Sequence, residues 1–155
     1  MRTVLIPTAL MLMACSGETT APAAAGGDRP IVVMSADGED LVIESGFVRP
    51  VAAGGNSAGY VTIRSDTADV LTGATSENFD VVELHETSAV DGAMRMRPVE
   101  RIDLPAGQTV MLAPGGQHLM LLGAREDIPE GSSLTVLLQF GSGKSVAFDL
   151  PVERR

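Results

Sequence analysis

The sequence predicts an all-β domain built as a sandwich or a barrel. From residue 31 onward, short runs of Val, Ile and Leu are interrupted by Gly, Pro, Asp and Asn at about the spacing of strands and turns in such folds. No amphipathic helix of three turns is apparent, and the frequent Val residues favour strands. Trp is absent and Tyr occurs once, so the core is expected to be aliphatic. A length of 155 residues fits a single domain.

Residues 1–14 have the proportions of a signal peptide that is removed from the mature protein. Arg2 supplies a basic start, and the apolar segment 4–13 is shorter than the ~20 residues that a membrane-spanning helix needs. The segment ends in Leu-Met-Ala-Cys, which resembles the lipobox of bacterial lipoproteins. This resemblance implies cleavage before Cys15 and acylation of that cysteine, and several acyl chains anchor a protein stably to a membrane. The alternative is an ordinary secretory signal that is cleaved near residues 23–25.

The segment 15–30 is small, polar and rich in Gly and Pro. It predicts a flexible tether between the lipid and the folded domain, which is expected to span residues 31–155. The chain has one cysteine, so an internal disulfide is excluded. These observations predict a periplasmic, membrane-anchored lipoprotein.

Within the domain, strands are predicted from apolar runs and their ends from turn-forming residues. The run 40–49 stops at Pro50, and the run 58–64 alternates as a half-buried strand does. Residues 102–107, which include Pro105 and Gly107, are expected to form a turn. The expected strands are 31–34, 40–49, 58–64, 69–75, 80–87, 93–99, 108–113, 117–122, 133–140 and 145–152.

Asp91-Gly92 is the strongest hairpin signal in the chain. The favoured two-residue turn needs a positive φ at both positions, which Asp-Gly supplies. Such a loop places Val90 opposite Ala93, so that the numbers of opposed residues sum to 183. His85 then faces Pro98, and Met96 is the diagonal neighbour of His85 on the same face of the hairpin.

The charge of the chain excludes several classes of partner. The formal net charge is −9, and loss of Arg2 with the signal peptide leaves 20 acidic and 10 basic residues. A nucleic-acid-binding protein needs a basic face to neutralise phosphates, so nucleic acid is not an expected partner. Electrostatic docking on anionic lipids is disfavoured for the same reason.

Both histidines of the chain lie near methionines, at spacings that strands can bring together. His118 and Met120 are two residues apart, so their side chains point to the same side of one strand. His85 and Met96 share a face of the predicted hairpin. Thioethers are soft ligands that select Cu(I), and imidazole binds copper well, whereas zinc sites use Cys, His and carboxylates. Taken singly, a methionine on a strand is usually core filler, so a structural role for these residues and a soft-metal site both remain open at this point.

The spacing His85, ten residues, Met96, twenty-one residues, His118, one residue, Met120 resembles the signature of the periplasmic copper chaperones of the PCuAC type. The segments around these residues, and Asn56 to Tyr60 further upstream, are also similar to that family. The resemblance implies a cupredoxin-like Greek-key β-sandwich that binds one Cu(I) through the four side chains. Many members have Met directly after the first histidine, where this chain has Glu86. Met94 shares the face of Met96 and is a candidate for a spare ligand.

The family also implies a function. A monomer would carry copper to a partner such as cytochrome c oxidase subunit II, for assembly of the CuA centre, or to another copper chaperone. The chain ends without the tail rich in His and Met that takes a second copper in some members, so one site is expected. Copper sequestration for tolerance is an alternative, and so is a structural envelope lipoprotein without metal, in which His85 and His118 would lie far apart. An enzyme is not expected, because no nucleophile context, phosphate loop or dinucleotide fingerprint is present.

Overall fold

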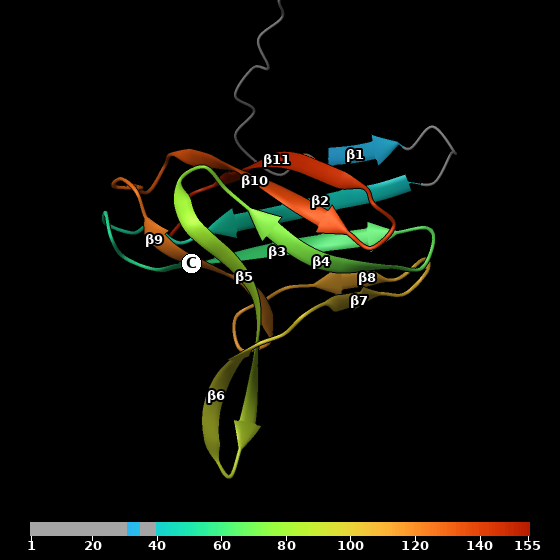
Figure 1. The fold of residues 1–155 in the computed structure, drawn as a ribbon, viewed down its shortest axis with the longest axis horizontal. Coiled ribbons are helices and arrows are strands. Elements are labelled where there is room, and N and C mark those ends of the chain that lie inside the picture. The colour runs from blue at the N-terminus through green and yellow to red at the C-terminus, as the bar shows by residue number, and fades with distance from the viewer. Residues whose placement is uncertain (1–30, 35–39) are drawn as a thin grey trace, which may run out of the picture.

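The computed structural model describes residues 31–34 and 40–155, which form eleven β-strands in two sheets (Figure 1). The paired strands are antiparallel and the sheets pack face to face, so the predicted all-β sandwich is confirmed. Within these residues, no helix is long and apolar enough to cross a membrane. The predictions about Cys15, the signal peptide and the tether concern residues outside the described range.

The two sheets differ in size. The smaller sheet has four strands, in the order β11 (Ser145–Pro151), β10 (Ser133–Phe140), β4 (Asp69–Thr75) and β7 (Ile102–Leu104). The larger sheet has seven strands, in the order β1 (Ile31–Met34), β2 (Asp40–Val48), β3 (Ser57–Ser65), β9 (Gln117–Ala124), β5 (Phe79–Val90) and β6 (Ala93–Pro98), with β8 (Thr109–Met111) also paired to β3.

The hydrophobic core lies between the sheets, because every second side chain of a strand points to the same face. On β10, each second residue from Leu134 to Phe140 is buried, and the residues between them are more exposed. β9 contributes Leu119 and Leu121, which have no exposed surface. Full burial of one such leucine contributes roughly 1.5–3 kcal/mol to folding. The residues that alternate with them on β9, including His118 and Met120, therefore point to the outer face of the larger sheet.

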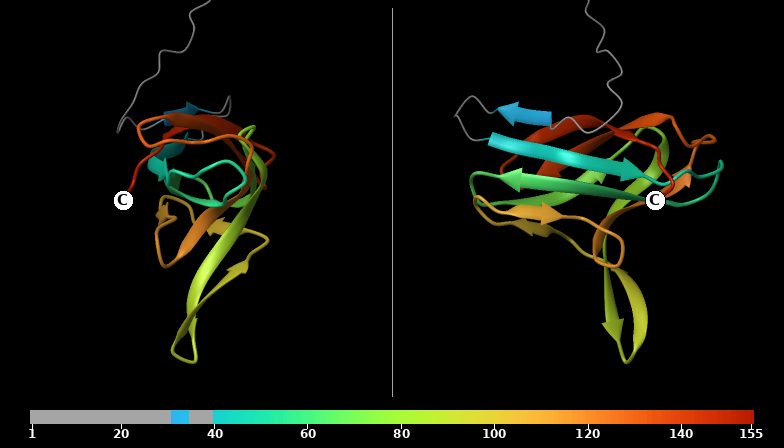
Figure 2. Two further views of the ribbon diagram at one scale, coloured as in Figure 1. Left: turned by 90° about the vertical axis from the view of Figure 1, so that its left-hand side faces the viewer. Right: turned by 180° about the vertical axis from the view of Figure 1, so that it is seen from behind.

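The predicted Asp91-Gly92 hairpin is present with the expected register. Val90 pairs with Ala93, and Asp91 and Gly92 have φ angles of 51° and 77°. β5 pairs with β9 only as far as Glu86, so the outer part of the hairpin stands clear of the sandwich (Figures 1 and 2). All six residues of β6 are exposed.

One predicted turn is wrong. Residues 102–104 of the expected turn 102–107 form strand β7, which pairs with β4 at the edge of the smaller sheet. Ile102 and Leu104 are each 1% exposed, so the strand is held by burial of these two side chains in the core. Pro105 and Gly107 follow the strand, so these two turn-forming residues mark its end and not a turn over the whole segment.

Candidate metal site

The two histidines of the chain face each other across neighbouring strands. In the register of β5 on β9, His85 is the direct partner of His118, and the centroids of their rings are 5.9 Å apart. Their neighbours Leu84 and Leu119 form the next pair and point into the core. Both imidazoles therefore lie on the outer face of the larger sheet.

The two methionines singled out in the sequence lie on the same face. Met96 pairs with Thr87, two residues from His85 on β5. Met120 follows His118 by two residues on β9 and pairs with Glu83. The sequence places each His and Met pair on one face of its own strand or hairpin. The structure adds that both pairs share one continuous sheet face. Met96, His118 and Met120 line one pocket on this face, and His85, which is not among the lining residues, lies opposite His118.

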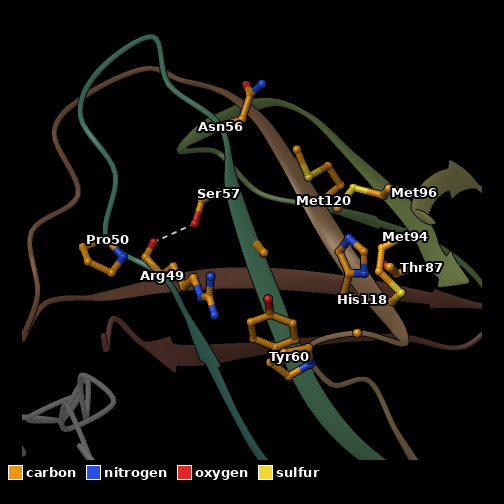
Figure 3. Close-up of a pocket in the computed structure, with 13 residues that line it drawn as sticks. Arg49, Pro50, Asn56, Ser57, Tyr60, Thr87, Met94, Met96, His118 and Met120 are labelled. Atoms are coloured by element: carbon orange, nitrogen blue, oxygen red, sulfur yellow. Dashed lines mark hydrogen bonds between the residues drawn. The ribbon is translucent and has the colours of Figure 1, made fainter. Parts of the chain in front are cut away.

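A pocket of about 540 Å³ opens over this face (Figure 3). His118, Met120, Met96 and Met94 line it on one side, and Arg49 lies across from Met94 and Met96 on the other. The side chains differ in exposure: His118 is 3% exposed, whereas Met96 is 53% exposed. The arrangement combines buried nitrogen donors with sulfur donors that solvent can reach.

One nitrogen of each imidazole is hydrogen-bonded within the protein. The Nδ1–H of His118 donates to the carbonyl oxygen of Gly116 at 3.1 Å, and the Nε2–H of His85 donates to a carboxylate oxygen of Glu83 at 2.8 Å. A carbonyl and a carboxylate can only accept, so each bond fixes which nitrogen carries the proton of the neutral ring.

The other nitrogen of each ring is buried and has no hydrogen-bond partner. These atoms are Nε2 of His118 and Nδ1 of His85. An unsatisfied buried polar atom costs about 1–3 kcal/mol, so native structures rarely retain one without a reason. Both nitrogens bear a free lone pair in the tautomers set by their neighbours, which is the state in which imidazole binds a metal ion. The donor set of two such nitrogens beside thioether sulfurs therefore fits a soft ion.

Glu83 is a residue of this region to which the sequence analysis assigned no role. Its carboxylate accepts a hydrogen bond from the His85 ring, as the outer partner does in a carboxylate–histidine–metal arrangement, where it orients the ring. The available signal was its position two residues before His85, which places both side chains on one face of a strand.

Tyr60 completes the surroundings of His118. Its ring centroid lies 6.3 Å from that of His118 and 4.9 Å from that of Phe47, and the Arg49 guanidinium lies 5.7 Å from the Tyr60 centroid. Tyr60 is 7% exposed although it belongs to the outer face, because these neighbours cover it. The ring thus shields one side of His118 from solvent.

Comparison with known proteins identifies the family and the fold of the chain. The sequence profile of the LpqE-like lipoprotein family matches residues 41–152. The protein Lxx21020 of Leifsonia xyli subsp. xyli (strain CTCB07), named as a lipoprotein, is 32% identical over 120 residues, which cover 76% of this chain and 71% of the relative.

Two solved structures are similar in fold. The apo PCuAC domain from PmoF1 matches with a TM-score of 0.62 and 27% identity, over 74% of this chain and 94% of that one. The copper-bound PCuAC domain from PmoF2 matches with a TM-score of 0.60 and 26% identity, over 74% and 93% of the two chains. The expected cupredoxin-like sandwich and the resemblance to PCuAC domains are thereby confirmed. The chain belongs to the LpqE-like lipoprotein family, and its fold is that of the PCuAC domains.

Proposed function

We propose that the domain binds one Cu(I) ion through His85, Met96, His118 and Met120 and passes it to a copper-requiring protein of the cell envelope. The observation that carries the proposal is the pair of buried imidazole nitrogens without partners, His85 Nδ1 and His118 Nε2, on facing residues of one sheet. The likeness to a copper-bound PCuAC domain supports the choice of metal. A metal-free structural lipoprotein would require neither the facing histidines nor their unpaired nitrogens.

The donor set favours Cu(I) over other ions. Two neutral imidazoles and two thioethers supply no negative charge, and soft thioethers select Cu(I). The chain would hold this ion through His85 Nδ1, His118 Nε2 and the sulfurs of Met96 and Met120. Because none of these ligands is a thiol, disulfide formation in an oxidising envelope would not destroy the site.

Transfer suits this site better than permanent storage. Met96 is 53% exposed, and the pocket beside it is open, so a donor of another protein can approach the ion from solvent. The binuclear copper centre of cytochrome c oxidase subunit II is the acceptor we propose, with another copper chaperone as the alternative. No step of this function is catalytic. Sequestration for copper tolerance would be better served by a closed site.

Attachment to the membrane belongs to the same proposal. The family to which the chain belongs is described as lipoproteins, which supports acylation at Cys15 and a location in the envelope. A domain held at the membrane surface by a tether would meet membrane-bound copper proteins more often than a freely diffusing one, because tethering raises the effective concentration of the two partners.

Anaerobic titration of the apo domain with Cu(I) in the presence of a competing chelator tests the proposal. We expect uptake of close to one equivalent. X-ray absorption at the copper edge should then show both nitrogen and sulfur neighbours, since the proposed ligands are two imidazoles and two thioethers. Uptake far below one equivalent, or a copper spectrum without sulfur neighbours, would contradict the proposed site.

Substitution of Glu83 tests the role of the outer carboxylate. We expect Glu83→Ala to weaken Cu(I) binding by about 10–100-fold, the usual effect of removing an outer partner of a metal-bound histidine. Glu83→Gln should retain part of the affinity, because its amide oxygen still accepts the Nε2–H of His85. Competition titration measures both changes.

Glu86→Gln is the matched control for these variants. Glu86 is also a glutamate of β5 next to His85, but it bonds Arg97 at 2.8 Å, and its position one residue from His85 places it on the other face. Its replacement should leave the affinity within about threefold of the wild type, since a surface ion pair contributes at most about 1 kcal/mol. Equal losses in Glu86→Gln and Glu83→Ala would refute a specific role for Glu83.

A further inference from the structure

A second methionine of β6 lies beside the proposed copper ligands. Met94 and Met96 are two residues apart, so they project from the same face of the strand. Both line the pocket that also contains His118 and Met120, and Figure 3 shows them on the same side of it. In the hairpin, Met94 pairs with Ala89 and Met96 with Thr87, which places Met94 two residue pairs nearer the tip.

Exposure of these side chains increases from the sandwich towards the tip of the hairpin. His118 is 3% exposed, Met96 53% and Met94 63%. The last pair between β5 and β9 joins Glu86 to Gln117, so Met94 lies on the part of the hairpin that β9 does not reach. An ion that moved outwards along this face would leave the donors of β9 and approach the sulfur of Met94.

Packing does not account for Met94. Core methionines are buried, whereas this side chain is mostly in solvent and belongs to a strand that is exposed along its whole length. Exposure alone does not indicate a functional role, because Met111 on β8 is 66% exposed as well. Met94 differs from Met111 in lining the pocket, on the face that carries the proposed ligands.

We propose that Met94 is an exchange ligand through which Cu(I) enters and leaves the site, an inference that rests on the proposed copper function. In the outward step, a bond forms between copper and the Met94 sulfur while the bond to the Met120 sulfur breaks. Both donors are neutral thioethers, so no proton moves and copper remains Cu(I). Met is flexible enough to follow the ion, because its side chain has three rotatable bonds. The incoming partner then supplies a soft donor, a thioether or a thiolate, from the exposed side of the hairpin.

The test separates affinity from the rate of transfer. Wild type, Met94→Leu, Met96→Leu and Met111→Leu are each loaded with one equivalent of Cu(I) without oxygen. Transfer to the chelator bicinchoninate is followed by stopped-flow absorbance, and affinity by competition at equilibrium. Leu is close to Met in volume, so the fold should be retained, which circular dichroism of the apo proteins checks.

We expect Met94→Leu to bind Cu(I) within about threefold of the wild type and to transfer it about tenfold more slowly. Transfer is slower because the variant lacks the sulfur that would bind copper during the outward step, and a tenfold change in rate corresponds to a modest loss of transition-state stabilisation. Met96→Leu should lose affinity itself. Met111→Leu, which removes an equally exposed methionine outside the pocket, should match the wild type in both measurements.

The outcomes distinguish this inference from the function on which it rests. If the wild type takes up no Cu(I), the proposed function fails and the exchange ligand fails with it. If the wild type loads but Met94→Leu transfers as fast as Met111→Leu, only the inference about Met94 is overturned. A loss of affinity in Met94→Leu as large as that in Met96→Leu would also overturn it, because Met94 would then be a permanent ligand.

Discussion

His118→Ala is expected to lower the affinity of the domain for Cu(I) by more than ~100-fold, since loss of even an outer partner of a ligand costs 10–100-fold. The imidazole is 3% exposed, and its free Nε2 belongs to the facing pair that we propose as the nitrogen donors. No other histidine in the chain can replace it, because the only other one is His85. Competition titration with a Cu(I) chelator gives the two affinities.

The apo form of His118→Ala should remain folded. Removal of the ring leaves a cavity, but it also removes a buried nitrogen that has no partner, and the two effects on stability oppose each other. Leu122→Ala is the matched control, because Leu122 lies on the same face of β9, two residues beyond Met120. Binding by a folded His118→Ala that matches the Leu122→Ala control would show that His118 is not a ligand.

Leu119→Ala is expected to destabilise the apo domain by about 2–5 kcal/mol, the range for truncating a buried leucine to alanine. Leu119 lies between His118 and Met120 on β9 but points to the opposite face, where none of its surface is exposed. Urea unfolding of the apo protein measures the change in the free energy of unfolding. Leu122→Ala, at a partly exposed position of the same strand, should cost much less.

The same variant separates packing from metal binding. In the absence of denaturant, the folded fraction of Leu119→Ala should bind Cu(I) with nearly the wild-type affinity, because no proposed donor has been removed. A destabilisation below about 1 kcal/mol would mean that the core does not depend on this position as its burial indicates.

Local patterns predicted most of the strands. The runs 69–75 and 133–140 match β4 and β10 at both ends, because turn-forming residues bound clear apolar segments. The hairpin register followed from Asp91-Gly92 alone, since a two-residue turn determines which residues oppose each other. β5, however, continues to Val90, three residues beyond the predicted end, because pairing with β6 keeps the polar residues near the turn in strand conformation.

Pairings between distant segments could not be predicted in this way. β7 was missed because a three-residue edge strand followed by Pro105 has the composition of a turn, and only its burial against the second sheet identifies it. The sequence likewise brings His85 and Met96 together through a local hairpin. It gives no local signal that β5 pairs with β9 and places His118 opposite His85, since 32 residues of other structure separate the two. The proposed ligands could be identified from their spacing and chemistry in the sequence. Their arrangement relative to one another became known only from the fold.

The facing histidines make the site sensitive to deletions within the two strands that carry them. The two imidazoles come from two different strands, and the register between those strands places them opposite each other. Leu84 and Leu119, paired beside them, bury their side chains on the opposite face and keep that register. A slip of one residue would exchange the two faces, sending an imidazole into the interior and a leucine into solvent. A one-residue deletion within either strand is therefore expected to disturb the core and the alignment of the two rings together.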